Sequence, residues 1–340
     1  MTALRAGPRG PQTAEEEQYV VVLPTLDERE GLAKTLDELF SVGVGPGQIL
    51  VVDGGSRDGT CLEAERRGVR CIQQSGKGKA DAVRTALRVV DADAVVIMDA
   101  DYTHPARYVP QLLTMLERCD EAIGARARPE KGAQRAVFRL GNKLLTAWFN
   151  VVFGTRLTDV LSGMYAVRKE ALEGIEEASR GFGIESEIAA HIASTGGEIC
   201  ETPIEYRRRV GRKKLGVRHG VLIALDMLRL SLRYNPAFLI FAAAALLAIP
   251  GFSIASWVGY EWIFLGVKHY VWGIIAIALI AGGTASAALA VLALYLKRME
   301  IRLLKAVRGA RTARGKATAQ RGDIRRGEEG QEARSEAGPC

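Results

Sequence analysis

Hydrophobic positions in the N-terminal part of the chain fall into short continuous runs separated by longer segments with helical spacing. Three apolar, β-branched runs predict buried strands, residues 19–23, 49–52 and 94–98, and residues 71–74 predict a further short strand. Three segments between them predict helices, the last of them after a short loop: residues 28–40, 61–68 and 76–90. Strands that alternate with helices indicate an α/β fold with a mostly parallel sheet flanked by helices.

The middle of the chain mixes apolar residues with arginine and lysine. Residues 135–153 predict a helix that rests on a membrane or lines a lipid groove, and a loop with Asp159 follows. A helix is predicted over 185–194 and a strand over 199–206. After a basic loop, residues 219–234 predict an amphipathic helix that lies in the plane of a membrane interface.

Two long stretches near the C-terminus, residues 235–260 and 270–296, contain no charged residue. Each is long enough to cross a hydrocarbon core of roughly 30 Å as a helix. They predict a transmembrane hairpin over 235–297, with spans at about 236–258 and 270–296.

Charge predicts the orientation of this hairpin. Its connector carries one lysine, whereas both flanks carry many basic residues. The positive-inside rule therefore predicts that both flanks, both termini and the N-terminal domain lie on the cytoplasmic side of the cell membrane. Four aromatic residues would form the outer belt: Trp257, Tyr260, Trp262 and Tyr270.

These patterns divide the chain into five segments. We expect a disordered leader over 1–17, a main domain over 18–218, an interface helix over 219–234, the hairpin over 235–297 and a basic, disordered tail over 298–340.

Composition narrows the class of partner. The net charge of +7 suits anionic lipid, and no recognisable nucleic-acid-binding module accompanies the basic residues, so we expect no nucleic-acid partner. The five cysteines are odd in number and widely spaced, without a CxxC pair. This spacing argues against zinc and favours reduced thiols in a cytosolic domain. The sequence leaves the oligomeric state open.

Acidic residues follow three of the predicted strands. Asp27, Asp53 and Asp99 each come just after a strand, and the carboxyl ends of parallel strands meet at one edge of a sheet. The segment MDADYTHP adds Asp101 two residues after Asp99. Two such carboxylates predict a site for Mg²⁺ or Mn²⁺ bound to a diphosphate, although the same pattern occurs in solvated surface turns.

Four motifs occur in order at strand ends: LPTLDERE, VVDGGSRDGT, GKGKADAVR and DADYTHP. Together with the downstream segments DVLSGMYAVRK, GFGIESEI and PIEYRRRVGRKKL, they resemble the family 2 glycosyltransferases with the GT-A (Rossmann-like) fold. The similarity is greatest to the polyprenyl-phosphate branch, the dolichol-phosphate mannose synthases and their relatives. It covers roughly residues 19–232.

The resemblance implies roles for individual residues. Seven residues would bind the nucleotide-sugar: Pro24, Asp27, Glu28, Asp53, Gly78, Lys79 and Asp99. Asp99, Asp101 and Thr103 would hold the metal ion, Thr103 standing where the family commonly has glutamine. Five residues would act in catalysis by contacting the metal, the phosphates or the acceptor: Asp101, Arg126, Asp159, Arg209 and Lys214. Ser162 and Gly163 match the segment that shapes the sugar and acceptor site.

The implied activity is transfer of a hexose from a UDP- or GDP-sugar to a polyprenyl phosphate, with inversion at the anomeric carbon. A lipid phosphate is already anionic, so it needs little help from a general base. If the acceptor were a hydroxyl group, Glu185 and Glu187 would be the candidate bases, although a structural role is favoured for both.

Two alternatives stay open. The first is a membrane glycosyltransferase with a hydroxyl acceptor, as in polysaccharide synthases, but no QxxRW motif is present. The second is a non-catalytic membrane scaffold, against which the intact acids at 53, 99 and 101 argue. The sequence does not choose the sugar, although Thr103 argues against GDP-mannose.

Overall fold

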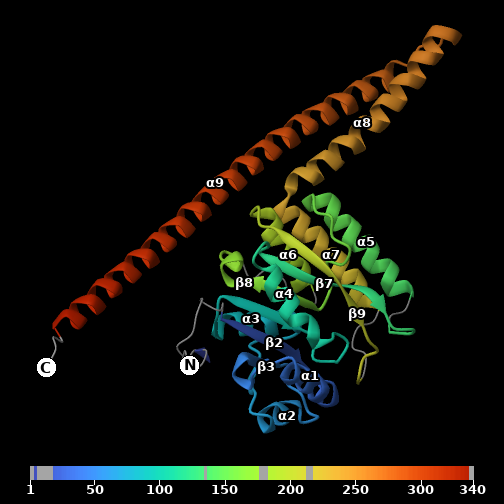
Figure 1. Cartoon of the computed structure of the whole chain (residues 1–340). Helices are drawn as coiled ribbons and strands as arrows, with labels where there is room; N and C mark the ends of the chain where they lie inside the picture. The colour runs from blue at the N-terminus through green and yellow to red at the C-terminus, as the bar shows by residue number, and fades with distance from the viewer. Residues whose placement is uncertain (1–3, 6–17, 134–135, 176–182, 212–216, 337–340) are drawn as a thin grey trace.

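The computed structural model describes residues 4–5, 18–133, 136–175, 183–211 and 217–336 (Figure 1). An α/β domain occupies most of this part of the chain, and a long helical hairpin extends from the domain.

A seven-stranded mixed sheet forms the centre of the domain, in the order β4-β3-β2-β6-β8-β7-β9. Its strands are β2 (Tyr19–Thr25), β3 (Ile49–Asp53), β4 (Arg70–Gln73), β6 (Ala94–Met98), β7 (Glu121–Pro129), β8 (Met164–Arg168) and β9 (Ile199–Tyr206). Strand β8 runs antiparallel to β6 and β7, and the other neighbours are parallel. Strands β3 and β6 are buried along their whole length, which explains their continuous apolar sequences. A short parallel pair joins β1 (Leu4–Arg5) to β5 (Val90–Asp91).

Helices cover both faces of the sheet. One face packs against α1 (Arg29–Ser41), α2 (Thr60–Arg66) and α4 (Val109–Met115). The other packs against α3 (Lys79–Val89), α5 (Ala136–Phe153), α6 (Ile184–Ser194) and α7 (Val217–Tyr234). Alternate residues of each strand point into the two apolar clusters, so Val20 and Val22 belong to one cluster and Val21 and Leu23 to the other.

The expected α/β fold is therefore confirmed, with a mostly parallel sheet between helices. The sequence interpretation missed β7 and β8. The segment of β8 was taken for a loop, and β7 reads EAIGARARP, with a short apolar run and exposed arginine in its second half.

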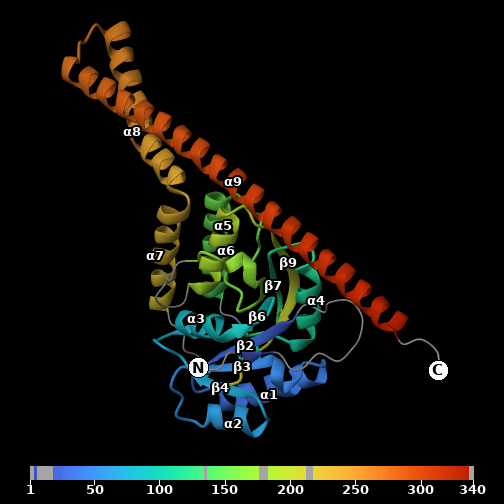
Figure 2. The ribbon, with the colours of Figure 1, turned by 90° about the vertical axis from the view of Figure 1, so that its left-hand side faces the viewer.

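The C-terminal hairpin consists of α8 (Pro236–Tyr260), a π-helical turn η4 (Glu261–Leu265) and α9 (Tyr270–Glu336). By length and composition, Pro236–Leu265 and Tyr270–Leu303 are each apolar enough to cross a membrane. Figure 2 shows that α8 leaves the domain at the end of α7 and that α9 runs back toward the domain from the far end of α8. The two helices pack closely at glycines, because a Cβ added to Gly283 would lie 2.8 Å from the Cβ of Ala248.

Two expected terminal segments differ in the structure. We expected residues 298–340 to lack regular structure, but α9 continues to Glu336. Its last part is rich in alanine, arginine and glutamate, which favour a helix intrinsically. Of the expected leader over 1–17, the described residues are Leu4–Arg5, which form β1.

The expectation of reduced thiols is wrong for four cysteines. Cys61 and Cys71 form one disulfide and Cys119 and Cys200 another, with Cα separations of 5.6 Å and 6.0 Å. The first links α2 to the edge strand β4, and the second fastens the opposite edge strand β9 beside β7. The sequence pattern concealed both pairs, because the packing of α2 beside β4 and the pairing of β7 with β9 bring these cysteines together.

Candidate active site

The acids expected at one edge of the sheet lie at the ends of three adjacent strands. Strands β3, β2 and β6 are neighbours and parallel, so their carboxyl ends lie together. Asp53 is the last residue of β3 and pairs in register with Thr25, and Asp99 follows β6 directly. The shared edge predicted from the sequence is therefore present.

Asp53 is a buried, ionised acceptor of hydrogen bonds. Its carboxylate accepts hydrogen bonds from the backbone N–H groups of Gly55 (3.0 Å) and Ser56 (2.8 Å) and from the Gln73 amide (3.1 Å). Burial raises the pKa of Asp53, but these hydrogen bonds outweigh burial and hold that pKa below its usual value. The loop after β3 thus fixes this carboxylate firmly.

The loop after β2 is tied to the same turn. Asp27 has left-handed backbone geometry, with φ 46°. Its carboxylate accepts a hydrogen bond from the Arg57 N–H at 2.7 Å, and its own N–H donates to the Ser56 hydroxyl at 2.8 Å. Pro24 lies in β2 opposite Val52. This pair of loops brings together Pro24, Asp27 and Asp53, which the resemblance assigned to nucleotide-sugar binding.

The second acid of the DAD segment, Asp101, is buried beneath a sharp turn. The Thr103 N–H and hydroxyl donate hydrogen bonds to its Oδ1 at 3.1 Å and 2.5 Å, and Tyr102 between them has a φ of 68°. Burial and the nearby Asp99 raise the pKa of Asp101, although Arg209 opposes this. The hydroxyl of Thr103, which we expected on the metal, therefore orients Asp101.

Arg209 lies over Asp101 from the segment after β9. Its Nε is 3.2 Å from Asp101 Oδ2, and its Nη2 contacts the Glu28 carboxylate. Burial would lower the pKa of Arg209, but Asp101 and Glu28 outweigh burial and raise it. The guanidinium of Arg209 thus joins Glu28, in the loop after β2, to Asp101 of the DAD segment.

Backbone hydrogen bonds hold this basic segment in place. The Arg207 N–H donates to the Thr103 carbonyl at 2.9 Å, and the Val210 N–H donates to the Asp101 carbonyl at 3.1 Å. Lys214, also expected in this segment, lies outside the described residues.

Lys79 has partners that the sequence did not indicate. It begins α3 directly after Gly78, whose φ is 88°, and its Nζ lies 2.5 Å from Asp99 Oδ1 and 2.6 Å from Glu185 Oε1. Burial would lower the pKa of Lys79, but the two carboxylates raise it above its usual value. Burial raises the pKa of Asp99, and Lys79 outweighs this effect and lowers it. Lys79 is therefore a buried cation shared by two acids.

Glu185 and Glu187, both on α6, form ion pairs with basic residues of α3. Glu187 lies 3.4 Å from the Arg84 guanidinium, and Glu185 lies against Lys79. These contacts are those of the structural role favoured from the sequence.

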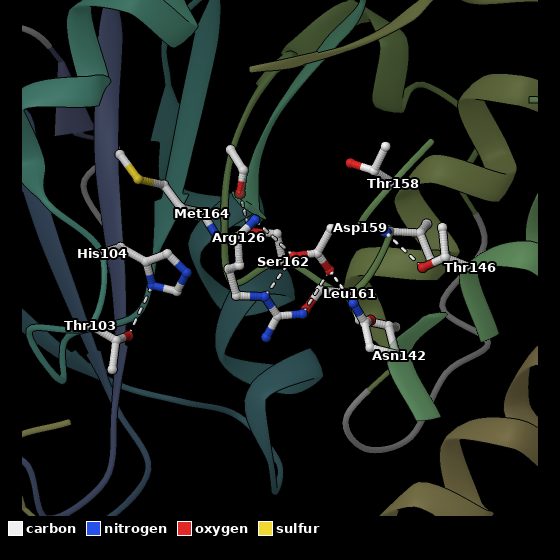
Figure 3. A network of polar contacts seen from close by, with 12 residues as sticks. Thr103, His104, Arg126, Asn142, Thr146, Thr158, Asp159, Leu161, Ser162 and Met164 are labelled. Atoms are coloured by element: carbon white, nitrogen blue, oxygen red, sulfur yellow. Dashed lines mark hydrogen bonds and ion pairs between the residues drawn. The ribbon is translucent and has the colours of Figure 1, made fainter. Parts of the chain in front are cut away.

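Arg126 and Asp159 form the centre of a further polar network (Figure 3). Arg126 Nε and Nη2 lie 2.6 Å and 2.7 Å from the two oxygens of Asp159, and Nη2 also donates to the Leu161 carbonyl at 3.0 Å. The Asn142 amide donates to Asp159 at 2.8 Å. Burial raises the pKa of Asp159, but Arg126 outweighs burial and lowers it. Two of the three guanidinium nitrogens of Arg126 therefore form hydrogen bonds within the domain. The third, Nη1, has no hydrogen bond among the described residues.

The sequence interpretation overlooked His104. Its ring is 1% exposed, its Nδ1 lies 3.1 Å from the Thr103 hydroxyl, and its Nε2 has no hydrogen-bond partner among the described residues. Figure 3 shows it across from Arg126, and its ring meets Tyr206 edge to face at 5.3 Å. Burial lowers the pKa of His104, although Asp99 and Asp101 oppose this. The available signal was its position three residues after Asp101.

Gly163 is required by the close approach of Asp99. A Cβ at Gly163 would overlap Asp99 Oδ2 and lie 2.6 Å from its Cγ. Next to it, the Ser162 hydroxyl donates to the Gly124 carbonyl at 2.5 Å. The SG pair of the sequence thus joins β8 to both β7 and the DAD segment.

The donor set of the acid pair fits a hard divalent cation. Two neighbouring carboxylates offer oxygen ligands. Burial and the nearby Asp99 disfavour the charged form of Asp101, and a bound cation would offset this cost. The described residues contain no group of three His, Cys, Asp or Glu side chains that could hold a metal alone. Substrate oxygens and water would have to complete the coordination.

Comparison with known proteins agrees with this fold. Residues 20–175 match the model of Glycosyl transferase family 2. The chain is 32% identical to the glycosyltransferase AglJ of Haloferax volcanii, over 76% of this chain and 86% of that protein. It is 31% identical to the dolichyl-phosphate hexose transferase of the same organism, over 58% and 87%.

A solved structure shares the fold at lower identity. The glucosyl-3-phosphoglycerate synthase of Mycobacterium tuberculosis, in complex with Mn²⁺, UDP-glucose and phosphoglyceric acid, has a TM-score of 0.53 and 22% identity, over 64% of this chain and 80% of that one. Together the fold, the acids at the strand ends and the relatives define the class: the protein is a glycosyltransferase with a GT-A-like fold. The chain belongs to glycosyl transferase family 2.

Proposed function

We propose that the protein transfers a hexose from a UDP- or GDP-sugar to a polyprenyl phosphate such as dolichyl phosphate, with inversion and with a requirement for Mg²⁺ or Mn²⁺. The observation that carries this proposal is the acid pair of half-buried Asp99 and buried Asp101, bordered by Lys79 and Arg209. The relative named dolichyl-phosphate hexose transferase supports the acceptor, and the synthase solved with Mn²⁺ and UDP-glucose supports the metal and the kind of donor.

The nucleoside would bind against the loops after β2 and β3. Pro24, Asp27, Glu28 and Asp53 border that side, where Asp53 is held rigidly by backbone donors. Asp101 would hold the divalent cation, which when bound would supply positive charge next to the diphosphate leaving group.

Basic side chains would complete the phosphate site. Arg209 and Lys214 belong to the basic segment, and Arg209 already lies between Glu28 and Asp101. Arg126 is fixed by Asp159 with its Nη1 amino group left for a phosphate oxygen. Fixed cations reduce the repulsion between two phosphorylated substrates, so positioning and electrostatics supply the rate acceleration.

An acceptor phosphate also fits the partners of Glu185. A hydroxyl acceptor would need a base, and the carboxylate of Glu185 is engaged by Lys79 at 2.6 Å. A phosphate oxygen needs no such base. This contact favours the lipid phosphate over the alternative of a hydroxyl acceptor.

The surface near the hairpin suits a lipid acceptor. Helices α5 and α7 meet where the Trp148 indole donates to the Ser231 hydroxyl at 3.2 Å, and Trp148 also packs against Phe238 at the start of α8. Apolar side chains on both helices are exposed: Val137, Leu140, Leu144, Val151, Leu225, Leu228 and Leu232. We assign residues 18–218 to catalysis, 219–234 to the membrane interface and 235–297 to two membrane spans, with the catalytic domain and both termini cytoplasmic.

A donor and acceptor panel tests the proposal. Full-length protein in detergent is incubated with radiolabelled UDP-glucose, UDP-N-acetylglucosamine or GDP-mannose, with dolichyl or undecaprenyl phosphate, and with Mg²⁺ or Mn²⁺. We expect labelled lipid from at least one donor, lost on addition of EDTA and reduced about 10²- to 10³-fold in Asp101→Asn, on the scale of removing one electrostatic contact to the transition state. Absence of labelled lipid with every donor would contradict the proposal.

A further inference from the structure

The ammonium group of Lys79 is held between two carboxylates inside the domain. It lies 2.5 Å from Asp99 and 2.6 Å from Glu185, and the side chains of Lys79 and Glu185 are only 17% and 9% exposed. Helices α3 and α6 cover the same face of the sheet, which brings the first residue of α3 to the first turn of α6. Two ion pairs therefore hold the ammonium group of Lys79 in place.

This contact engages Asp99 on both sides. One carboxylate oxygen meets Lys79, and the other lies against the Cα of Gly163. Asp101 differs, because its counter-ion Arg209 comes from the segment beyond β9 and not from the core of the domain. The two acids of the DAD segment thus have different counter-ions: Asp99 pairs with Lys79 of α3, and Asp101 pairs with Arg209 of the segment after β9.

We propose that Lys79 is a resident counter-ion of Asp99 that weakens binding of the divalent cation at the acid pair, and that Glu185 tunes this effect. The inference rests on the proposed metal-dependent transfer and revises the assignment of Lys79 made from the sequence. Lys79 and Glu185 are positioning residues, which act on the cation through Asp99.

Electrostatics gives the two residues opposite effects on metal affinity. Lys79 repels an approaching cation and occupies an oxygen of Asp99, so its removal should tighten metal binding. Glu185 offsets part of the lysine charge, so its neutralisation should leave that charge acting on Asp99 and weaken metal binding. If the contact only stabilised the fold, removing Lys79 and neutralising Glu185 would change metal affinity in the same direction.

Manganese binding tests this directly. Full-length wild type, Lys79→Met and Glu185→Gln are titrated with Mn²⁺ alone and with Mn²⁺ plus UDP or GDP, and free Mn²⁺ is measured by electron paramagnetic resonance. We expect binding about tenfold tighter in Lys79→Met and about threefold weaker in Glu185→Gln, the order expected when one charge beside the site is removed. Arg84→Met is the matched control, because Arg84 is also on α3 but pairs with Glu187. It should bind Mn²⁺ like the wild type.

A charge-preserving variant and nucleotide binding without metal complete the test. Lys79→Arg should keep wild-type Mn²⁺ affinity, and Lys79→Gln replaces Lys79→Met if the latter does not fold. Affinity of Lys79→Met for UDP and GDP without metal should stay within about twofold of the wild type, because this lysine serves Asp99. A loss of tenfold or more would make Lys79 a direct nucleotide contact and overturn the inference.

The remaining outcomes separate the inference from the proposed function. If the wild type binds Mn²⁺ but both variants weaken it alike and unfold at equally lower temperatures, the contact is structural and the inference is wrong while metal dependence stands. If the wild type binds no Mn²⁺ with either nucleotide, the metal-dependent function is wrong and the inference falls with it.

Discussion

The guanidinium of Arg126 donates hydrogen bonds to the carboxylate of Asp159 from two nitrogens, Nε at 2.6 Å and Nη2 at 2.7 Å. The Arg126 backbone N–H donates to the same carboxylate at 3.0 Å. Arg126 is on β7, and Asp159 is in the loop that precedes β8. Glu201 on β9 extends the contact, because its two oxygens accept the N–H groups of Thr158 and Asp159. The charge pair therefore fastens the loop to β7, and the hydrogen bonds of Glu201 fasten it to β9.

We expect Asp159→Asn to lower the free energy of unfolding by about 3–5 kcal/mol, because it leaves the buried Arg126 without its counter-ion. Thermal and urea unfolding measure this loss. Glu117→Gln is the control, since Glu117 is exposed, and it should change stability by less than about 0.5 kcal/mol. A loss below about 1 kcal/mol in Asp159→Asn would show that the pair adds little to stability.

Glu121 should make stability depend on pH in the direction opposite to an ordinary carboxylate. It is buried, one of its oxygens has no hydrogen bond among the described residues, and burial, Glu185 and Glu201 raise its pKa well above the usual value. The folded state therefore keeps the proton that the unfolded chain releases near pH 4.5, and the stability from this group is lost as pH rises from there through the folded pKa.

Glu121→Gln should consequently stabilise the protein, by about 1–3 kcal/mol at pH 8, because glutamine is neutral in both states and does not have to take up a proton on folding. Unfolding temperatures of the variant and the wild type between pH 4 and pH 8 measure the effect. The gain should be small at pH 4 and grow with pH. A gain that does not vary with pH would mean that Glu121 does not titrate in this range.

The parts of the fold and site that the sequence predicted are those that depend on local pattern. Continuous apolar runs locate β2, β3 and β6, and parallel pairing then places Asp27, Asp53 and Asp99 at one edge. Strands β7 and β8 have shorter apolar runs, in segments for which the sequence pattern predicts no strand, and their places depend on pairing with distant segments.

Partners of single side chains were equally out of reach. The contact of Lys79 with Glu185 exists only because α3 and α6 pack on the same face of the sheet. Within the part of the chain that the structure describes, His104 Nε2 is buried without a hydrogen-bond partner, which no spacing in the sequence reports. Sequence motifs therefore indicated which residues gather at the site, whereas the structure shows which of them neutralise one another.

The two disulfides predict a specific count of thiols. Four of the five cysteines are paired, so labelling of the unreduced, denatured protein with a maleimide should modify one cysteine, and labelling after reduction should modify five. Five labels before reduction would restore the expectation of reduced thiols.

Removing the disulfides should lower stability according to the loops they close. The bonds span sequence separations of 10 and 81 residues. Because a longer loop restricts the unfolded chain more, Cys119→Ser should cost more than Cys61→Ser, about 4 against about 3 kcal/mol. Thermal unfolding under non-reducing conditions measures the difference, and equal losses would argue against this explanation.

Gly163 should tolerate no side chain, since a Cβ there would overlap the Asp99 carboxylate. We expect Gly163→Ala to displace Asp99 from Lys79 and to reduce sugar transfer about 10²-fold, the scale of effect that a misplacement of about 1 Å has on a catalytic group. Gly141→Ala is the matched control, because nothing lies within 4 Å of its added Cβ. That substitution, inside α5, should preserve activity and raise stability by up to about 1 kcal/mol. Transfer assays and thermal unfolding of both variants decide the matter: full activity in Gly163→Ala would mean that the position of Asp99 is not critical for transfer.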